Sequence, residues 1–284
     1  MKFKVPLIIG AALVGLGVTT SVVALAIGQF DFDELDGNII SKTYDITGEF
    51  TSIDVDLTTS DFNIYVSRDD TNKAVCLEKE NITFDIKVEN NVLKIVENYE
   101  FELNLLPLSR KTDVSLFVSK DVYESLNIVS SSGDVDISDT FTFTDVNIDI
   151  TTGDVSFTSK ATNNINIKAT TGDVDVYKAT ANNLSIDVST GDVEILESNL
   201  TGNINVELTT GDLEVDIISC NDFKCKTTTG DKELSNVICN NINIQTTTGS
   251  TYLDNVIATI LLAGIEIDTN SFNLKTTNRT YEAA

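Results

Sequence analysis

Hydrophobic and polar residues alternate along most of this chain, and one phrase recurs within the alternation. The phrase is Thr-Thr-Gly-Asp-Val or a close variant, repeated every 19 or 20 residues. Its glycines are Gly133, Gly153, Gly172, Gly191, Gly211, Gly230 and Gly249. A constant period of this length is typical of repeat architectures, so residues 126–255 are predicted to fold as repeats.

The residues around each glycine are apolar at every second position. The column seven residues before the glycine contains Leu126, Val146, Ile165, Leu184, Ile204, Phe223 and Ile242, and the column four residues after it contains Ile137, Phe157, Val176, Ile195, Val215, Leu234 and Leu253. A period of two indicates half-buried strands. Each repeat is therefore predicted to contain two short strands, with a Thr-Gly-Asp corner on one side and an Asn- or Ala-containing corner on the other.

Columns of like residues favour an all-β, parallel β-solenoid, in which each coil lies about 4.8 Å above the previous one. The alternative is an antiparallel meander with hairpin turns, which explains the alternation but not the persistence of whole columns. Glycine suits the repeated corner because it adopts a positive φ without strain at Cβ.

The regions that flank the repeats depart from the period. Residues 52–66 fit the same frame with Ser60 in the place of glycine, whereas residues 70–120 resemble longer, hairpin-like strands. We expect an irregular N-terminal β portion at residues 40–125 that is continuous with the solenoid. Residues 256–284 are expected to form a C-terminal cap and tail, in which residues 256–267 cover the open end of the core.

The segment from Val5 to Ile27 is uncharged and would be about 34 Å long as a helix, enough to cross a bilayer. Lysines precede it and an acidic linker, residues 29–39, follows it. Residues 1–28 are therefore predicted to be a transmembrane helix that anchors a single-pass cell-membrane protein with its C-terminal domain outside the cell. The alternative is a cleavable signal peptide and a secreted protein, since Ala24-Leu25-Ala26 resembles a cleavage site.

Composition narrows the classes of function. The 284 residues include no His and no Trp, and the formal net charge is −25. The absence of His excludes His-based catalytic triads and His metal sites. Such a negative surface repels nucleic acid and favours cationic partners, namely divalent metals, basic peptides or basic polymers.

The outward positions after each corner are acidic. One residue after the glycine stand Asp134, Asp154, Asp173, Asp192, Asp212 and Asp231, and three residues after it stand Asp136, Asp175, Glu194, Glu214 and Glu233. These carboxylates are predicted to form one acidic face. Neighbours about 4.8 Å apart repel each other by about 1 kcal/mol in water, so something must offset the repulsion.

Two interpretations of the acidic face stay open. In the first, each leading Asp accepts N–H bonds at its corner, and the other carboxylates are solvated and screened. In the second, Ca²⁺ or a cationic polymer bridges neighbouring coils. The candidate metal ligands are then Asp154, Asp173, Asp175, Asp192, Glu194, Asp212 and Glu214. No other cofactor is predicted.

The four cysteines occupy apolar contexts. Cys225 and Cys76 are expected to be buried free thiols. Cys220 and Cys239 lie at equivalent positions of consecutive repeats, so their Cα atoms should be one coil apart. That separation allows a disulfide, and two free thiols would fill the same slot equally well.

The order of these elements resembles the bacterial putative-adhesin family of β-strand-repeat cell-envelope proteins. The resemblance is carried by "TSDFNI", the strand-rich insertion, "SLFVSKDVYESLNIVSSSGDVDIS" and the tandem "TTGDV" phrases, over residues 40 to about 255. It implies a location at the cell surface, an adhesin-like role and, in some members, a link to envelope stress. It supplies no catalytic residues to carry over.

The resulting expectation is a non-enzymatic, adhesin-like protein. Besides the membrane that holds its anchor, its expected partners are cationic peptides, cell-envelope polymers or surface proteins. A structural spacer without a ligand is the alternative. A carbohydrate-active β-helix enzyme is disfavoured, because the corners are short and the acids form a stripe instead of an isolated acid–base pair.

Overall fold

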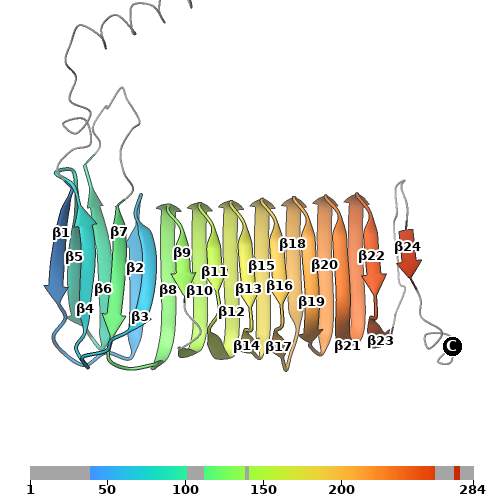
Figure 1. The fold of residues 1–284 in the computed structure, drawn as a ribbon, viewed down its shortest axis with the longest axis horizontal. Helices are drawn as coiled ribbons and strands as arrows, with labels where there is room; N and C mark the ends of the chain where they lie inside the picture. Colours follow the sequence, from blue (N-terminus) through green and yellow to red (C-terminus); the bar gives the residue numbers. More distant parts are fainter. Residues whose placement is uncertain (1–38, 101–111, 138–140, 260–271, 276–284) are drawn as a thin grey trace, which may run out of the picture. The chain divides into compact units, whose positions relative to one another are not determined.

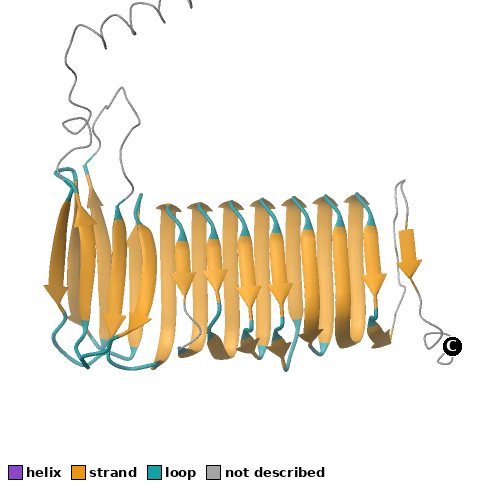
Figure 2. Ribbon diagram, viewed as in Figure 1, coloured by secondary structure: helices purple, strands orange, loops and turns teal. Residues whose placement is uncertain are grey.

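The structure is a computed structural model that describes residues 39–100, 112–137, 141–259 and 272–275. Every regular element in these ranges is a β-strand (Figures 1 and 2), and none of them contains a helix long and apolar enough to cross a membrane. The predicted anchor at residues 1–28 and almost all of the acidic linker lie outside the described residues.

The described residues form twenty-four strands. Those before the repeats are β1 (Ile40–Asp45), β2 (Ser52–Leu57), β3 (Asp61–Val66), β4 (Lys73–Glu78), β5 (Ile82–Glu89), β6 (Val92–Tyr99) and β7 (Asp113–Val118). Those of the repeats are β8 (Val122–Ser132), β9 (Val135–Ile137), β10 (Thr142–Thr152), β11 (Val155–Phe157), β12 (Lys160–Thr171), β13 (Val174–Tyr177), β14 (Thr180–Ala181), β15 (Asn183–Thr190), β16 (Val193–Leu196), β17 (Asn199–Leu200), β18 (Ile204–Thr210), β19 (Leu213–Ser219), β20 (Asp222–Thr229), β21 (Lys232–Thr248), β22 (Thr251–Asp254), β23 (Ile257–Thr259) and β24 (Phe272–Lys275).

The repeats stack as a parallel β-solenoid. The long strands β8, β10, β12, β15, β18 and β20 pair in parallel, each with the next, and β20 pairs with the second half of β21. The short strands that follow the corners pair in the same way. Ile148 lies beside Ile167, and Ile167 beside Ile186, so equivalent residues of successive coils are neighbours. The solenoid prediction is confirmed for the repeats, and the antiparallel meander is excluded for them.

The predicted apolar columns form the core. All the members of the two columns named above are buried. Between them stand further buried columns, such as the one that contains Ile128, Ile148, Ile167, Ile186, Val206 and Cys225. The side chains of one coil therefore rest on identical or similar side chains of the next.

The five coils that begin at Gly172, Gly191, Gly211, Gly230 and Gly249 contain one more bend than the sequence analysis predicts. Six residues after the corner glycine, a non-glycine residue has a positive φ: Lys178, Glu197, Ile217, Asn236 and Asn255, with φ between 49° and 54°. This bend separates the post-corner strand from a very short third strand, which is β14 in one coil and β17 in the next. In these two coils the predicted two-strand repeat therefore gains a third strand.

The glycine of the Thr-Gly-Asp corner cannot be replaced by a residue with a Cβ atom, for two reasons. Gly172 has a φ of +137°, and a Cβ atom built on it would lie 1.8 Å from the carbonyl oxygen of Gly153 in the preceding coil. The stacked corners approach one another too closely for any Cβ. The glycine is therefore required by coil-to-coil contact as well as by the backbone conformation.

The N-terminal β portion belongs to the same sheet, but its strands do not follow chain order. The strands β2 and β3 form a coil that pairs in parallel with β8 and β9 on one side and with β6 and β7 on the other. The strands β4 to β7 stand between β3 and β8 in the sequence. Antiparallel pairs, β5 with β6 and β4 with β1 and β7, complete this end. The hairpin-like strands expected at residues 70–120 are confirmed.

The corner between β2 and β3 shows why Ser60 can replace glycine. Ser60 is not among the residues with positive φ. The backbone N–H groups of Thr58, Thr59 and Ser60 all donate to the carboxylate of Glu97, at 3.0–3.1 Å. Glu97 is buried and belongs to β6, so a carboxylate of the neighbouring strand stabilises this variant corner.

At the other end, polar residues replace the inward valine after the corner. Thr251 and Lys232 are both buried there. The strand β24 pairs in parallel with β22. Residues 260–271, which include most of the predicted cap, lie outside the described residues.

Candidate functional site

The acidic side chains that follow the corners stand in two adjacent columns, which together are called the acidic face. The first, the aspartate ladder, consists of Asp134, Asp154, Asp173, Asp192, Asp212 and Asp231. The second, the outer acidic column, consists of Asp136, Asp175, Glu194, Glu214 and Glu233. Apart from the half-buried Asp134, all of these residues are exposed. The alternation of the short strands β9, β13, β16, β19 and the start of β21 turns the outer column outward while valine and leucine point into the core.

The aspartate ladder is a hydrogen-bonded structure. The Oδ1 atom of each aspartate accepts the backbone N–H of the aspartate one coil further on; for example, Asp173 donates to Asp154 at 2.8 Å. The same contact, at 2.7–3.0 Å, recurs from Asp134 up to Ser250, which takes the last place. These hydrogen bonds agree with the interpretation in which each leading Asp accepts backbone N–H bonds at the corners. The negative charge of each carboxylate is thereby partly compensated by a backbone donor.

The outer acidic column lacks that compensation. Glu194 lies in register between Asp175 and Glu214, and Glu214 lies beside Glu233. Burial, followed by the charges of Asp175 and Glu214, raises the pKa of Glu194. Burial, followed by the charges of Asp173 and Asp154, raises the pKa of Asp175. The column is thus a row of crowded like charges, which a nearby cation would stabilise.

A shallow depression of about 380 Å³ lies along the C-terminal half of the face. Carboxylates of three coils border it, and Tyr252 continues the outer column beside Glu233. Tyr252 is a member of this surface that the sequence analysis missed. The alternation of "STYLD" would have placed it there, because Tyr252 stands three residues after Gly249.

A buried lysine lies beneath the depression. The ammonium of Lys232 donates to Gly230 O at 2.6 Å, to Thr246 Oγ1 at 2.6 Å and to Thr227 Oγ1 at 3.1 Å. Burial lowers the pKa of Lys232. The three acceptors satisfy the three donors of the ammonium group, which explains how the core accommodates a charge at this position.

The candidate metal ligands stand in rows. Across the described ranges, no three His, Cys, Asp or Glu side chains gather closely enough to hold a metal ion. The face brings Asp154, Asp173, Asp192 and Asp212 into one row and Asp175, Glu194 and Glu214 into the other. This arrangement suits a diffuse cation or a linear cationic chain better than a single coordinated ion.

The long strands expose a different surface. Asn166 donates to Asn147, and Asn147 donates to Asn127, each at 2.9 Å. Beside this asparagine ladder, acidic and basic positions alternate in part, as where Glu207 lies between Asp187 and Lys226. This surface therefore carries a more mixed set of side chains than the two acidic columns do.

The cysteines are all free thiols in the structure, and Cys76 and Cys225 are buried as expected. Cys220 donates its backbone N–H to Ile238 O of the adjacent coil, next to Cys239. The hydrogen bond to the Cys239 thiol, together with burial, raises the pKa of Cys220.

Comparison with known proteins identifies relatives at the level of family and fold. The sequence matches the profile of the Toastrack DUF4097 family over residues 44–218. No curated protein matches it.

The solved structures that share the fold include two putative adhesins. A putative adhesin from Bacteroides fragilis is 18% identical, with a TM-score of 0.50, over 76% of this chain and 97% of that one. A putative adhesin from Parabacteroides distasonis is 17% identical, with a TM-score of 0.53, over 79% of this chain and 94% of that one. At such identities the likeness concerns the fold alone.

Proposed function

This chain belongs to the Toastrack DUF4097 family, and on that premise we propose that it is a non-enzymatic, adhesin-like binding module whose acidic face captures cationic partners. The adhesin-like role is carried over from the two solved structures that bear this name. The observation that carries the proposal for this chain is the outer acidic column. Its carboxylates are exposed, in register and uncompensated by backbone donors.

The geometry of the column favours an extended partner. Its charges are spaced by one coil, about 4.8 Å, along a straight row. A basic peptide or a basic envelope polymer can place several cations along such a row at once, whereas a compact ion neutralises only two neighbours. Divalent cations would then act mainly by screening. The geometry therefore favours basic polymers over simple ions as partners.

The location of the module is a second part of the proposal. The apolar segment Val5–Ile27, with Lys2 and Lys4 before it, would hold the solenoid outside the cell membrane, and cleavage would release it. The domain boundaries follow: an anchor at residues 1–28, a linker at 29–39, the N-terminal β portion at 40–125, the solenoid at 126–255 and a C-terminal cap. Protease treatment of intact cells should degrade the repeats, and full protection would contradict this topology.

The absence of catalysis is also part of the proposal. The chain has no His, and the acids of the face form continuous rows instead of a pair on opposite walls of a cleft. Incubation with envelope polysaccharides should leave their length distribution unchanged. Shortened chains would support the alternative of a carbohydrate-active enzyme.

The direct test compares two variants that remove the same amount of charge. The column variant combines Asp175→Asn, Glu194→Gln and Glu214→Gln. The control variant combines Asp149→Asn, Asp187→Asn and Glu207→Gln on the long strands. Binding of a fluorescent octalysine peptide in low salt should weaken about tenfold or more in the column variant, because each lost carboxylate removes on the order of 1 kcal/mol.

The control variant should lose much less affinity. Equal losses in the two variants would show that net charge, and not the column, determines binding. No binding by the wild type would favour a structural spacer without a ligand.

A further inference from the structure

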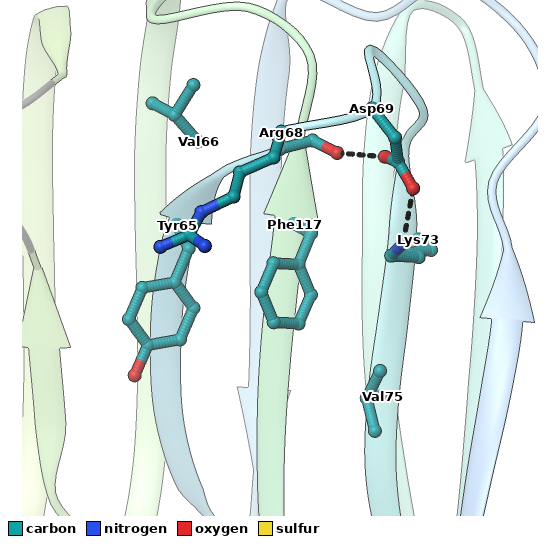
Figure 3. A pocket seen from close by; sticks show the side chains of 8 residues that line it. Tyr65, Val66, Arg68, Asp69, Lys73, Val75 and Phe117 are labelled. Carbon is teal, nitrogen blue, oxygen red and sulfur yellow. Dashed lines mark hydrogen bonds and ion pairs between the residues drawn. The ribbon is translucent and has the colours of Figure 1, made fainter.

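A groove on the N-terminal β portion combines two aromatic rings with Arg68 and with the ion pair of Lys73 and Asp69. Tyr65 on β3, Phe117 on β7 and Lys73 on β4 are cross-strand neighbours in one row. The rings of Tyr65 and Phe117 stack with centroids 5.3 Å apart and an interplanar angle of 28° (Figure 3). Val66, Val75 and Arg68 complete a groove of about 620 Å³, within the range of small-molecule sites.

Arg68 gives the groove a charge that is rare in this protein. It is the one arginine among the described residues of a chain whose net charge is −25. Its side chain extends from the loop after β3 toward the Tyr65 ring (Figure 3), and within the described residues it has no ion pair or hydrogen bond. The Lys73 ammonium lies 5.9 Å from the centroid of the Phe117 ring. A guanidinium without a carboxylate partner is suited to bidentate binding of one.

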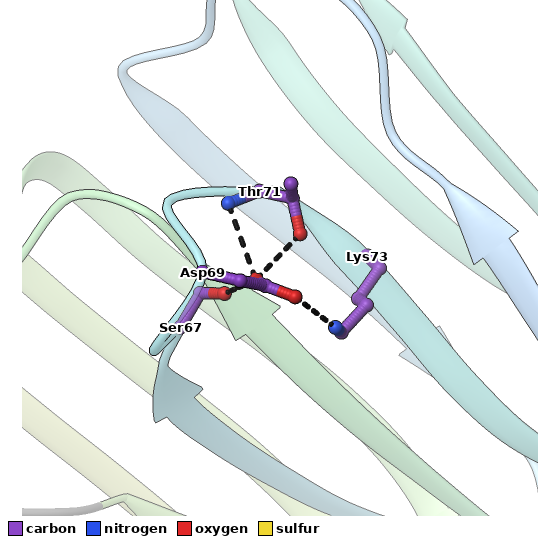
Figure 4. Close-up of polar contacts among 4 residues, drawn as sticks. All are labelled: Ser67, Asp69, Thr71 and Lys73. Carbon is purple, nitrogen blue, oxygen red and sulfur yellow. Dashed lines mark hydrogen bonds and ion pairs between the residues drawn. The ribbon is translucent and has the colours of Figure 1, made fainter.

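The loop that presents Arg68 is held in place. The carboxylate of Asp69 accepts hydrogen bonds from Ser67 Oγ at 2.6 Å, Thr71 Oγ1 at 2.7 Å and Lys73 Nζ at 2.8 Å (Figure 4). These bonds, that from Lys73 first, lower the pKa of Asp69, so it stays ionised. The backbone N–H of Ser67 also donates to Val118 O at 2.7 Å. The backbone on either side of Arg68 is therefore held in place, so the loop presents this residue beside the rings.

The groove is lined mainly by side chains. The strand β7 is paired on both edges, with β3 and β4, and β4 is paired with β7 and β1, while β3 pairs with β9 over Phe62–Ile64. An extended peptide cannot add to β7 or β4 at the groove, because strand addition needs an unpaired edge. The groove is therefore suited to recognition by ring stacking and by charge.

We propose that this groove binds an acidic sugar residue of a glycan, with its pyranose ring against Tyr65 and Phe117 and its carboxylate on Arg68. The apolar C–H face of a pyranose covers aromatic rings, and its hydroxyl groups can hydrogen-bond to polar side chains at the rim. The orientation of the bound sugar in the groove follows from the charges around it. Asp136 and Asp113 lie near the Tyr65 hydroxyl and, after burial, raise its pKa, so the carboxylate lies at the Arg68 end.

This site is separate from the acidic face and binds a ligand of opposite charge. Because the molecule repels polyanions as a whole, the groove suits glycans in which acidic residues alternate with neutral ones. Failure of one proposal leaves the other intact, since their residues and probes differ.

The test uses isothermal titration of the full chain with two probes. The first is a tetrasaccharide of alternating glucuronate and N-acetylglucosamine, and the second is the same tetrasaccharide with its carboxyl groups reduced to alcohols. The wild type should bind the first more tightly. Arg68→Gln should weaken binding of the acidic probe about tenfold or more, which corresponds to the loss of a charged hydrogen-bonded pair, and should leave binding of the reduced probe unchanged.

Tyr65→Ser should weaken binding of both probes. Its matched control is Tyr252→Ser, because Tyr252 is 41% exposed and Tyr65 is 39% exposed, and Tyr252 lies on the acidic face. Melting temperatures equal to that of the wild type establish that the variants fold. The proposal is overturned if the wild type binds neither probe at about 10 mM, if Tyr252→Ser weakens binding as much as Tyr65→Ser, or if a Glu-Ser repeat peptide binds through Arg68 while the sugar does not.

Discussion

The corner glycines show how a single residue type can be required by stacking. At Gly172 the φ of +137° is one constraint, and the carbonyl oxygen of Gly153, 1.8 Å from a virtual Cβ, is a second. The first was predictable from the Thr-Gly-Asp phrase. The second was not, because it depends on how closely two coils approach.

Replacement of one corner glycine should therefore be costly. We predict that Gly172→Ala lowers the free energy of unfolding by about 3 kcal/mol or more, because backbone strain and overpacking add. Urea denaturation followed by circular dichroism would measure the loss. The control Ser156→Ala, at an outward position of β11, should change stability by less than about 0.5 kcal/mol. A Gly172→Ala variant as stable as the control would contradict the stacked corner.

The second bend of the coil contains a strained residue. Ile217 has a φ of 54°, which is unfavourable for a β-branched side chain, and its side chain is 54% exposed. The next two coils have Asn236 and Asn255 at this position. We predict that Ile217→Asn raises the free energy of unfolding by about 1 kcal/mol, since asparagine tolerates the left-handed conformation.

A matched control exists one coil away. Ile238 is 56% exposed and lies in β21, outside the set of residues with positive φ. Ile238→Asn should not stabilise the protein. Equal effects of the two substitutions in thermal and chemical denaturation would mean that surface polarity, and not backbone strain, is responsible.

At the scale of elements, the outer acidic column links stability to pH. The pKa of Glu194 is raised above its ordinary value of 4.5, so the folded protein binds this proton more tightly than the unfolded chain does. The resulting stability is fully present below about pH 4.5 and is lost as the pH rises through the folded pKa. In low salt, Glu194→Gln should therefore be at least as stable as the wild type at pH 7.

Measurements of unfolding at pH 7 and pH 4 would test this link. The advantage of Glu194→Gln at pH 7 should shrink at pH 4 and also on addition of salt. Glu207→Gln is the control, because Glu207 lies between one acidic and one basic neighbour, Asp187 and Lys226. A wild type that clearly exceeds Glu194→Gln at pH 7 would show that Glu194 is stabilising and not repelled.

The strands also show which structural features the alternation of apolar and polar residues can predict and which it cannot. The columns through Ile148 and Glu194 were predictable, because one face of every strand is buried and the period is constant. The third short strand was not, since Lys178 and Glu197 carry no signature of a left-handed bend. Neither was the place of β6 beside β2, because parallel pairing out of chain order leaves no periodic trace.

The groove that contains Tyr65 and Phe117 could not be predicted from the sequence for the same reason. Tyr65 and Phe117 are separated by 52 positions in the sequence, and only the pairing of β3 with β7 brings them together. The sequence analysis could place each ring on an outward strand position at most. Their stacking depends on a long-range register that no local pattern encodes.

At the scale of the whole molecule, the charge of −25 should make the protein sensitive to simple cations. We predict that Ca²⁺ and Mg²⁺ at equal millimolar concentrations raise the melting temperature by the same amount, because both screen the acidic face. A shift specific to Ca²⁺ that Asp173→Asn abolishes would instead establish a calcium site in the aspartate ladder. Melting curves with each ion and with chelator would distinguish the two results.

The central claim is that the acidic face binds cationic polymers electrostatically, and the salt dependence of polylysine binding tests it most directly. Affinity for the full chain would be measured from about 20 mM to 500 mM NaCl, where the screening length falls severalfold. The account predicts that the logarithm of the association constant falls steeply and steadily with the logarithm of salt concentration, and less steeply for the column variant. Binding that survives high salt undiminished, or equal slopes in the two proteins, would contradict it.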